Sequence, residues 1–180
     1  MGNKPKVINF FAGPGAGKST TAAGVYSLMK QRGLGAELVT EAAKDATWEE
    51  HKFLLSQQVS LFAEQLRRQT RLIGKREVIV TDSPILLPAL VYNTGWENLA
   101  ALAWEAWDKF DNINFFIRRS KPYDTEGRRE TEYEAKEKDQ KSLDMLIAHA
   151  VPFTIIDSDK AGIESVVDHY LNRSQSITFH

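Results

Sequence analysis

The sequence predicts an α/β fold with a five-stranded parallel sheet flanked by helices. Short runs rich in Val, Ile and Phe alternate with stretches of helical periodicity, and these runs are too continuous for strands that expose one face to water. Helices between the strands are the crossover connections that a parallel sheet requires. The 180 residues, of which 42% are hydrophobic, suffice for one compact core. We therefore expect residues 1–180 to form a single domain.

The expected elements follow one another in this alternating order. The apolar runs predict strands over 6–11, 36–40, 77–81, 113–117 and 153–156. The helical patterns between them predict helices over 17–31, 47–73, 96–110, 130–149 and 161–172, with a shorter one over 85–92. The helix over 47–73 is expected to begin at a capping box, because Thr47 and Glu50 have the spacing at which each side chain bonds the other's backbone N–H.

Composition excludes several classes of protein. The 23 Lys and Arg against 24 Asp and Glu give a net charge of −1, so any attraction to nucleic acid would have to be local. The absence of Cys excludes disulfides, thiolate metal sites and cysteine nucleophiles, and the four His lack metal-ligand spacing. No stretch approaches the roughly 20 apolar residues of a membrane span, and the first residues lack the apolar region of a signal peptide. We expect a cytoplasmic protein without membrane contact.

The residues after the first expected strand, AGPGAGKS over 12–19, match a Walker A phosphate-binding loop, with Ala12 in place of the first Gly. Small residues let the backbone wrap a phosphate with its N–H groups, and the following helix adds its positive dipole end. Lys18 would reach the β- and γ-phosphates, the Ser19 hydroxyl would bind Mg²⁺, and Thr20 would contact the α-phosphate. We therefore predict ATP and Mg²⁺ as ligands, bound by Gly13, Pro14, Gly15, Ala16, Gly17, Lys18, Ser19 and Thr20.

Two carboxylates follow expected strands, at the edge of a parallel sheet where ligands bind. Asp82 follows the strand over 77–81, where an acid holds the magnesium shell or takes a proton from an acceptor hydroxyl. Its alternative role is a turn cap. Glu41 closes the strand over 36–40 and is a candidate general base, with a solvated acid at a helix start as the alternative.

A charged segment over 118–130 is expected to form a lid, because it contains Pro and Gly and almost no apolar side chain. Arg118 and Arg119 open it, and Arg128 and Arg129 close it. An arginine that reaches the transferring phosphoryl group when a lid closes stabilises its charge while water is excluded. We predict Arg118 and Arg128 as catalytic, and an ordinary charged surface loop is the alternative.

Two further groups of side chains have two interpretations each. The tryptophans, Trp48, Trp96, Trp104 and Trp107, are expected to pack in the core, with stacking on a base as the alternative. The polar side chains of the long second helix face either an acceptor or the solvent, and these are Gln57, Gln58, Gln65 and Arg68.

With these residues identified, the whole chain resembles the small P-loop kinases related to the nicotinamide-riboside kinase domain of bacterial NAD regulators. Besides the phosphate loop, three segments carry the resemblance: TEAAKD over 40–45, TDSP over 81–84, and the lid pattern RxxKPYxxxGR over 118–128. Many compact members are encoded by tailed bacteriophages, and some resemble the kinases that phosphorylate 5-hydroxymethyluracil in phage DNA. The resemblance implies a single P-loop kinase domain.

The leading functional prediction is an ATP-dependent kinase that transfers the γ-phosphoryl group to a hydroxyl of a nucleoside-type acceptor. The resemblance implies a 5-hydroxymethylpyrimidine base in phage DNA, within the host cytoplasm, and basic residues over 67–76 would form a local track for the DNA backbone. A free nucleoside, a nucleotide or nicotinamide riboside is the alternative acceptor. An ATPase switch that controls partner binding is the alternative from a different functional class.

Overall fold

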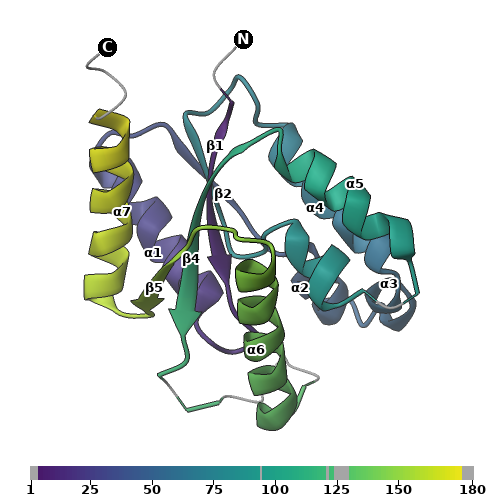
Figure 1. Ribbon diagram of the computed structural model, residues 1–180. Helices are drawn as coiled ribbons and strands as arrows, with labels where there is room; N and C mark the ends of the chain where they lie inside the picture. Colours follow the sequence, from purple (N-terminus) through teal and green to yellow (C-terminus); the bar gives the residue numbers. More distant parts are fainter. Residues whose placement is uncertain (1–3, 94, 121, 124–129, 176–180) are drawn as a thin grey trace.

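The computed structural model describes residues 4–93, 95–120, 122–123 and 130–175, and it contains one five-stranded parallel sheet (Figure 1). The strand order is β2-β3-β1-β4-β5, with every neighbouring pair parallel. The strands are β1 (Lys6–Phe11), β2 (Ala36–Val39), β3 (Val78–Thr81), β4 (Asp111–Arg118) and β5 (Thr154–Asp157). The expected fold class and all five expected strands are confirmed, with β4 longer than its apolar run.

β1 lies at the centre of the sheet because its side chains are apolar towards both helical layers. Ile8 pairs with Val80 of β3 and with Ile113 of β4. Phe10 packs in the same cluster as Ile8, whereas Phe11 packs in the cluster on the opposite face. Since all strands run in one direction, their carboxyl ends meet at the same edge, which is where open α/β sheets bind ligands.

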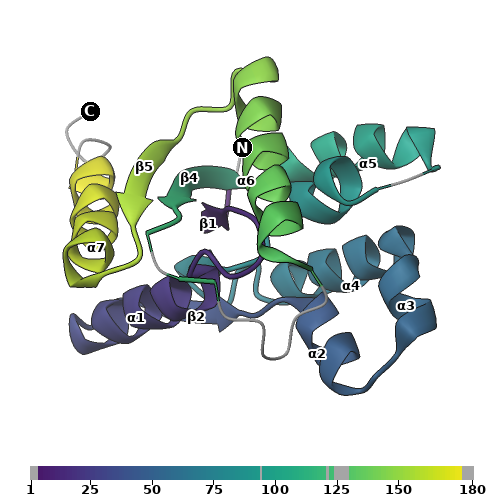
Figure 2. The ribbon, with the colours of Figure 1, turned by 90° about the horizontal axis from the view of Figure 1, so that it is seen from below.

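Helices cover both faces of the sheet (Figure 2). One layer holds α1 and α7, which pack side by side, and the other holds α4, α5, α6 and a short π-helix, η1. The bounds are α1 (Lys18–Gln31), α2 (Ala42–Trp48), α3 (Lys52–Ser56), α4 (Gln58–Thr70), η1 (Leu87–Val91), α5 (Glu97–Trp107), α6 (Glu132–Ala148) and α7 (Lys160–Gln175). Within the described part of the chain, no helix is both long and apolar enough to cross a membrane.

The expected long helix over 47–73 is wrong, because the chain forms three helices there, α2, α3 and α4. Glu50 has φ +54°, a left-handed conformation that ends α2, and Gln57 has φ −98° and ψ 79°, which separates α3 from α4. The expected capping box is also wrong: the Thr47 hydroxyl lies inside α2 and donates to the Ala43 carbonyl at 2.9 Å. With these breaks, both α2 and α3 contribute side chains to the pocket described below, such as Thr47 and Leu55.

Candidate functional site

The phosphate-binding loop connects β1 to α1, and two of its glycines have conformations that other residues rarely adopt. Gly15 has φ +75° and Gly17 has φ +103°. A Cβ atom at Gly17 would lie 2.2 Å from the Ser158 hydroxyl oxygen, so this position has no room for a side chain. The turn directs the loop into α1, whose first N–H groups have no partner within the helix and are suited to an anion.

Lys18, the first residue of α1, is buried beneath the loop. Its Nζ donates a hydrogen bond to the Gly13 carbonyl at 2.9 Å, and only 8% of the residue is exposed. Burial lowers the pKa of the Lys18 ammonium, while the carboxylates of Glu41 and Asp82 oppose this shift. The ammonium is therefore held between the loop and the two carboxylates that the sequence singled out.

The start of the loop is anchored by α6 and by the end of β4. The Gly13 N–H donates to Asp139 Oδ1 at 2.6 Å, and Arg119 donates to Asp139 Oδ2 and to the Pro14 carbonyl, both at 2.7 Å. The backbone of α6 lies so close that a Cβ atom at Gly13 would lie 2.3 Å from the Ala135 carbonyl oxygen. Arg119 and Asp139 are thus structural contacts of the loop that composition and motif did not reveal.

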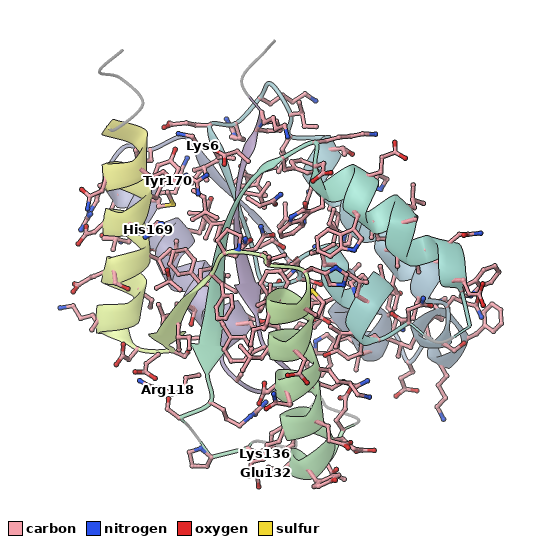
Figure 3. All side chains as sticks on the ribbon, viewed as in Figure 1. Lys6, Arg118, Glu132, Lys136, His169 and Tyr170 are labelled. Atoms are coloured by element: carbon pink, nitrogen blue, oxygen red, sulfur yellow. The ribbon has the colours of Figure 1, made fainter. Side chains whose placement is uncertain are left out.

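The structure brings Arg119, rather than the predicted Arg118, to the phosphate loop. Successive side chains of an extended strand point in opposite directions, which separates these two neighbours. Arg118 donates to both Asp157 carboxylate oxygens, at 2.9 and 2.5 Å, and its side chain is 66% exposed (Figure 3). Arg128 lies outside the described residues.

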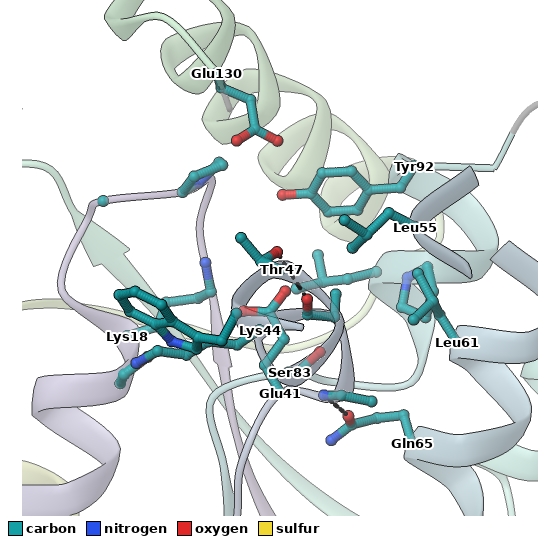
Figure 4. Close-up of a pocket in the computed structure, with 18 of the residues that line it drawn as sticks. Lys18, Glu41, Lys44, Thr47, Leu55, Leu61, Gln65, Ser83, Tyr92 and Glu130 are labelled. Atoms are coloured by element: carbon teal, nitrogen blue, oxygen red, sulfur yellow. Dashed lines mark hydrogen bonds between the residues drawn. The ribbon is translucent and has the colours of Figure 1, made fainter. Parts of the chain in front are cut away.

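A pocket of about 410 Å³ opens between the phosphate loop and the helices α2, α3, α4 and η1 (Figure 4). One end consists of loop residues and the start of α1, which include Lys18 and Ser19. The helices contribute the apolar side chains of Leu55, Leu61, Leu87 and Pro88, together with the polar Gln58 and Gln65. Most of the predicted nucleotide-binding residues therefore line a cavity that continues beyond the phosphate end, and these are Pro14, Gly15, Gly17, Lys18, Ser19 and Thr20.

The two predicted carboxylates occupy different positions at the strand ends. Glu41 lines the pocket, and burial raises the pKa of its carboxyl group, with Asp82 and Glu130 adding to the rise and Lys18 opposing it. Asp82 is 2% exposed, and within the described residues its Oδ1 has no hydrogen-bond partner. Glu41 is therefore the carboxylate that faces the cavity, whereas Asp82 is a buried group with one unused oxygen.

Sequence reasoning did not identify two polar side chains at the mouth of the pocket. The Glu130 carboxylate and the Tyr92 hydroxyl point towards the same space (Figure 4). Burial raises the pKa of Tyr92, and the nearby carboxylates Glu41 and Glu130 raise it further. Tyr92 follows an apolar segment and Glu130 lies in a charged one, so neither stood out from its neighbours.

The tryptophans do not all pack in the core as expected, because Trp96 is 56% exposed and is not among the residues that line the pocket. Trp107 is 7% exposed and packs in the core, as expected. Trp48 is 67% exposed and lines the pocket from the end of α2. Trp48 is therefore placed for stacking, which was the alternative interpretation.

The solved structure of deoxyadenosine kinase from M. mycoides with bound dATP has a similar fold, with a TM-score of 0.59 and 17% sequence identity over 92% of this chain and 99% of that chain. No curated protein has a significantly similar sequence. A protein family described as AAA domain matches residues 7–164, which span the sheet, the phosphate loop and the pocket. The fold and the loop agree with this match, and the chain belongs to this AAA domain family, with the fold of a P-loop NTPase.

Proposed function

We propose that the protein is an ATP-dependent kinase that phosphorylates a hydroxyl group of a nucleoside-type acceptor. The observation that carries this proposal is one pocket that is lined by the phosphate loop, by the Glu41 carboxylate and by a group of apolar side chains. A hydrolase needs room only for nucleotide and water, whereas this cavity extends past the loop to Tyr92 and Glu130. The fold shared with deoxyadenosine kinase supports the same reaction class.

The residues present fit an ATP-bound Mg²⁺ ion. Asp82 is buried next to Ser83, which lines the pocket, and its Oδ1 has no hydrogen-bond partner among the described residues, so it is a hard oxygen ligand of the kind that Mg²⁺ and its water shell prefer. Ser19 itself lines the pocket. Mg²⁺ would neutralise charge on the β- and γ-phosphates. Lys18 and the N–H groups at the start of α1 would hold the phosphates, as predicted from the loop.

Glu41 is the proposed general base. Its raised pKa makes the ionised carboxylate a better proton acceptor than an ordinary Glu. The acceptor O–H would give its proton to Glu41 while its oxygen bonds to the γ-phosphorus and the bond to the β-phosphate oxygen breaks. Arg118 and Arg128 stay predicted lid arginines, and Arg118 would have to leave Asp157 in order to act.

The charges around the pocket favour an acceptor without a phosphate of its own. Glu41 and Glu130 both line it, with Lys44 as a basic residue near Glu41, and a phosphate monoester placed between the two carboxylates would be repelled by both. The apolar side chains of the pocket and the exposed ring of Trp48 suit a base. A nucleoside hydroxyl therefore fits the described lining better than a nucleotide.

The finer hypothesis is that the hydroxyl belongs to a 5-hydroxymethylpyrimidine base in DNA. The predicted basic track over 67–76 bears on it, because ion pairs already engage three of its arginines in the structure. Arg67 pairs with Glu64, Arg68 with Glu64 and Asp45, and Arg76 with Glu37. These pairs reduce the positive charge available to a DNA backbone. We therefore propose a free nucleoside, rather than a base in DNA, as the leading acceptor.

The test uses ATP labelled at the γ-phosphate with parallel acceptors: common nucleosides, nicotinamide riboside, nucleoside monophosphates, and duplex DNA with or without 5-hydroxymethyluracil. We expect label in a nucleoside and none in the monophosphates. Lys18→Met should abolish transfer, and Lys30→Met, an exposed lysine near the far end of α1, should not. Label confined to modified DNA would favour the DNA hypothesis. ATP hydrolysis with no labelled acceptor would overturn the proposal in favour of a switch.

A further inference from the structure

A single glutamine on α4 contacts both strand ends that carry the candidate carboxylates. Gln65 is 1% exposed, although it also borders the pocket. A buried amide is costly unless its donors and its acceptor are paired, so its partners indicate what holds it there. Those partners come from the β2–α2 junction and from the end of β3.

At the first strand end, the Gln65 amide bonds to the peptide groups on both sides of Glu41. Its Oε1 accepts from the Ala42 N–H at 3.0 Å (Figure 4). Its Nε2 donates to the Thr40 carbonyl at 3.4 Å. Glu41 is the residue before α2 and makes no side-chain cap for that helix. The Ala42 N–H is one of the donors that a helix start leaves without an internal partner, and Gln65 supplies the missing acceptor.

At the second strand end, the same Nε2 donates to the Thr81 hydroxyl oxygen at 3.4 Å. That oxygen accepts from the Ser83 N–H at 3.1 Å, which closes a turn around Asp82. One amide therefore spans the residues that flank Glu41 and the turn that contains Asp82. Arg68, one turn along α4, adds a second bond to the Thr40 carbonyl at 3.3 Å.

We propose that Gln65 is a positioning residue that holds the backbone of Glu41 and the Asp82 turn in the geometry needed for phosphoryl transfer. This inference rests on the proposed kinase function. Gln65 acts through the peptide groups of Glu41, whose side-chain direction they determine. A misplacement of about 1 Å in such a group costs a rate factor of about 100, so the effect belongs in kcat.

The test compares three variants for kcat, for the KM of ATP and of the acceptor, and for hydrogen exchange at the Ala42 amide. Gln65→Met keeps the length of the side chain and removes all three hydrogen bonds. Gln69→Met is the matched control, because Gln69 lies on the same helix, is 1% exposed, and has no partner for its Nε2 among the described residues. We expect Gln65→Met to lower kcat about 100-fold and to speed hydrogen exchange at the Ala42 amide, with the KM of ATP unchanged. Gln69→Met should leave both kcat and this exchange rate unchanged.

Gln65→Glu provides a readout that loss of packing would not change. When protonated, the new carboxyl group can accept from the Ala42 N–H and donate its one proton to the Thr40 carbonyl, which restores two of the three bonds, whereas the ionised form has no proton to donate. The ratio of its kcat to that of the wild type should therefore rise as the pH falls. A flat ratio, or an equal loss of kcat in Gln69→Met, would overturn the proposal.

The experiments distinguish failure of the kinase proposal from failure of the positioning role of Gln65. If the wild-type protein phosphorylates none of the acceptors, the kinase function fails, and the exchange rate at Ala42 still decides whether Gln65 holds this segment. If the wild type is active and Gln65→Met retains its kcat, the positioning role fails alone. A Gln65→Met protein that does not fold leaves the pH ratio of Gln65→Glu as the deciding measurement.

Discussion

Glu41 combines a position on the pocket with a raised pKa. Its carboxyl group faces the pocket, and its environment favours the protonated form through burial and through the negative charges of Asp82 and Glu130. Lys18 opposes that shift. A carboxylate in this setting binds a proton more readily than an exposed Glu and still reaches the acceptor. Position and charge environment together, rather than residue type, make it the candidate base.

The pH dependence of transfer tests this role. As the pH falls through the raised pKa, Glu41 takes up a proton and can no longer accept one, so kcat should fall on the acid side at a pH above the ordinary Glu value of 4.5. Glu41→Gln should lower kcat by a factor of about 100 to 10,000 and remove this acid limb, while ATP binding is retained. Steady-state rates across pH provide the measurement. The control is Glu49→Gln, at the exposed end of α2, and an equal loss there would contradict the prediction.

At this scale, the sequence predicts the residues that a motif or a strand end determines. Lys18 and Ser19 follow from the loop spacing, and Glu41 follows from the rule that ligands bind at the carboxyl ends of parallel strands. The choice between Arg118 and Arg119 depends on the side to which each points at the end of β4, and the sequence carries no signal for it. For Gln65 the sequence could not decide between an acceptor-facing and a solvent-facing side chain, because its hydrogen-bond partners lie at the ends of strands that are distant along the chain.

Among the elements, α6 links the lid segment to the phosphate loop. It begins directly after Glu130, which lines the pocket, and Asp139 on the same helix holds the Gly13 N–H. Its start is fixed by a capping box in which the Thr131 hydroxyl accepts from the Glu134 N–H and the Glu134 carboxylate accepts from the Thr131 N–H. The cap therefore fixes where α6 starts, directly after Glu130.

Removal of this cap should have both a stability effect and a functional effect. Thr131→Ala should lower the free energy of unfolding by about 1 kcal/mol, because the first turn of α6 loses a bonded N–H. It should also raise the KM of the acceptor, since Glu130 loses its fixed neighbour. Thermal or denaturant unfolding and steady-state kinetics measure the two effects. Thr70→Ala, at the exposed end of α4, should change neither by a comparable amount, and an equal loss in it would contradict the role of the cap.

The strands could be predicted from the sequence, and the segment over 47–73 could not. The central strands β1, β3 and β4 contain apolar runs that are buried, so local composition and final environment agree there, whereas the edge strand β5 exposes Ile155. The helix breaks at Glu50 and Gln57 occur without Gly or Pro, the residues that usually signal a break. The ties from Gln65 and Arg68 on α4 to the β2–α2 junction hold the broken arrangement, and no local pattern encodes them.

For the molecule as a whole, the proposed nucleotide site should couple binding to stability. The loop takes its shape from contacts with β1, β4 and α6, so only the folded chain offers it. ATP with Mg²⁺ at about 100 times its dissociation constant should add roughly 2.7 kcal/mol, or a rise in Tm of about 5 to 10 °C. Differential scanning fluorimetry measures the shift. Chelation of Mg²⁺ should reduce it, Lys18→Met should remove it, and an unchanged Tm with Mg-ATP would contradict the site.

β1 can pair with its neighbouring strands β3 and β4 only late in synthesis. Lys6 pairs with Val78 of β3 and with Asp111 of β4, so the strand that carries the phosphate loop leaves the ribosome long before either partner. Contacts so distant along the chain form slowly, because closing a long loop costs entropy. At the proposed site, a nascent chain would therefore gain affinity for a nucleotide only once β3 and β4 have emerged. A bound nucleotide would then stabilise a chain whose central strands are already paired.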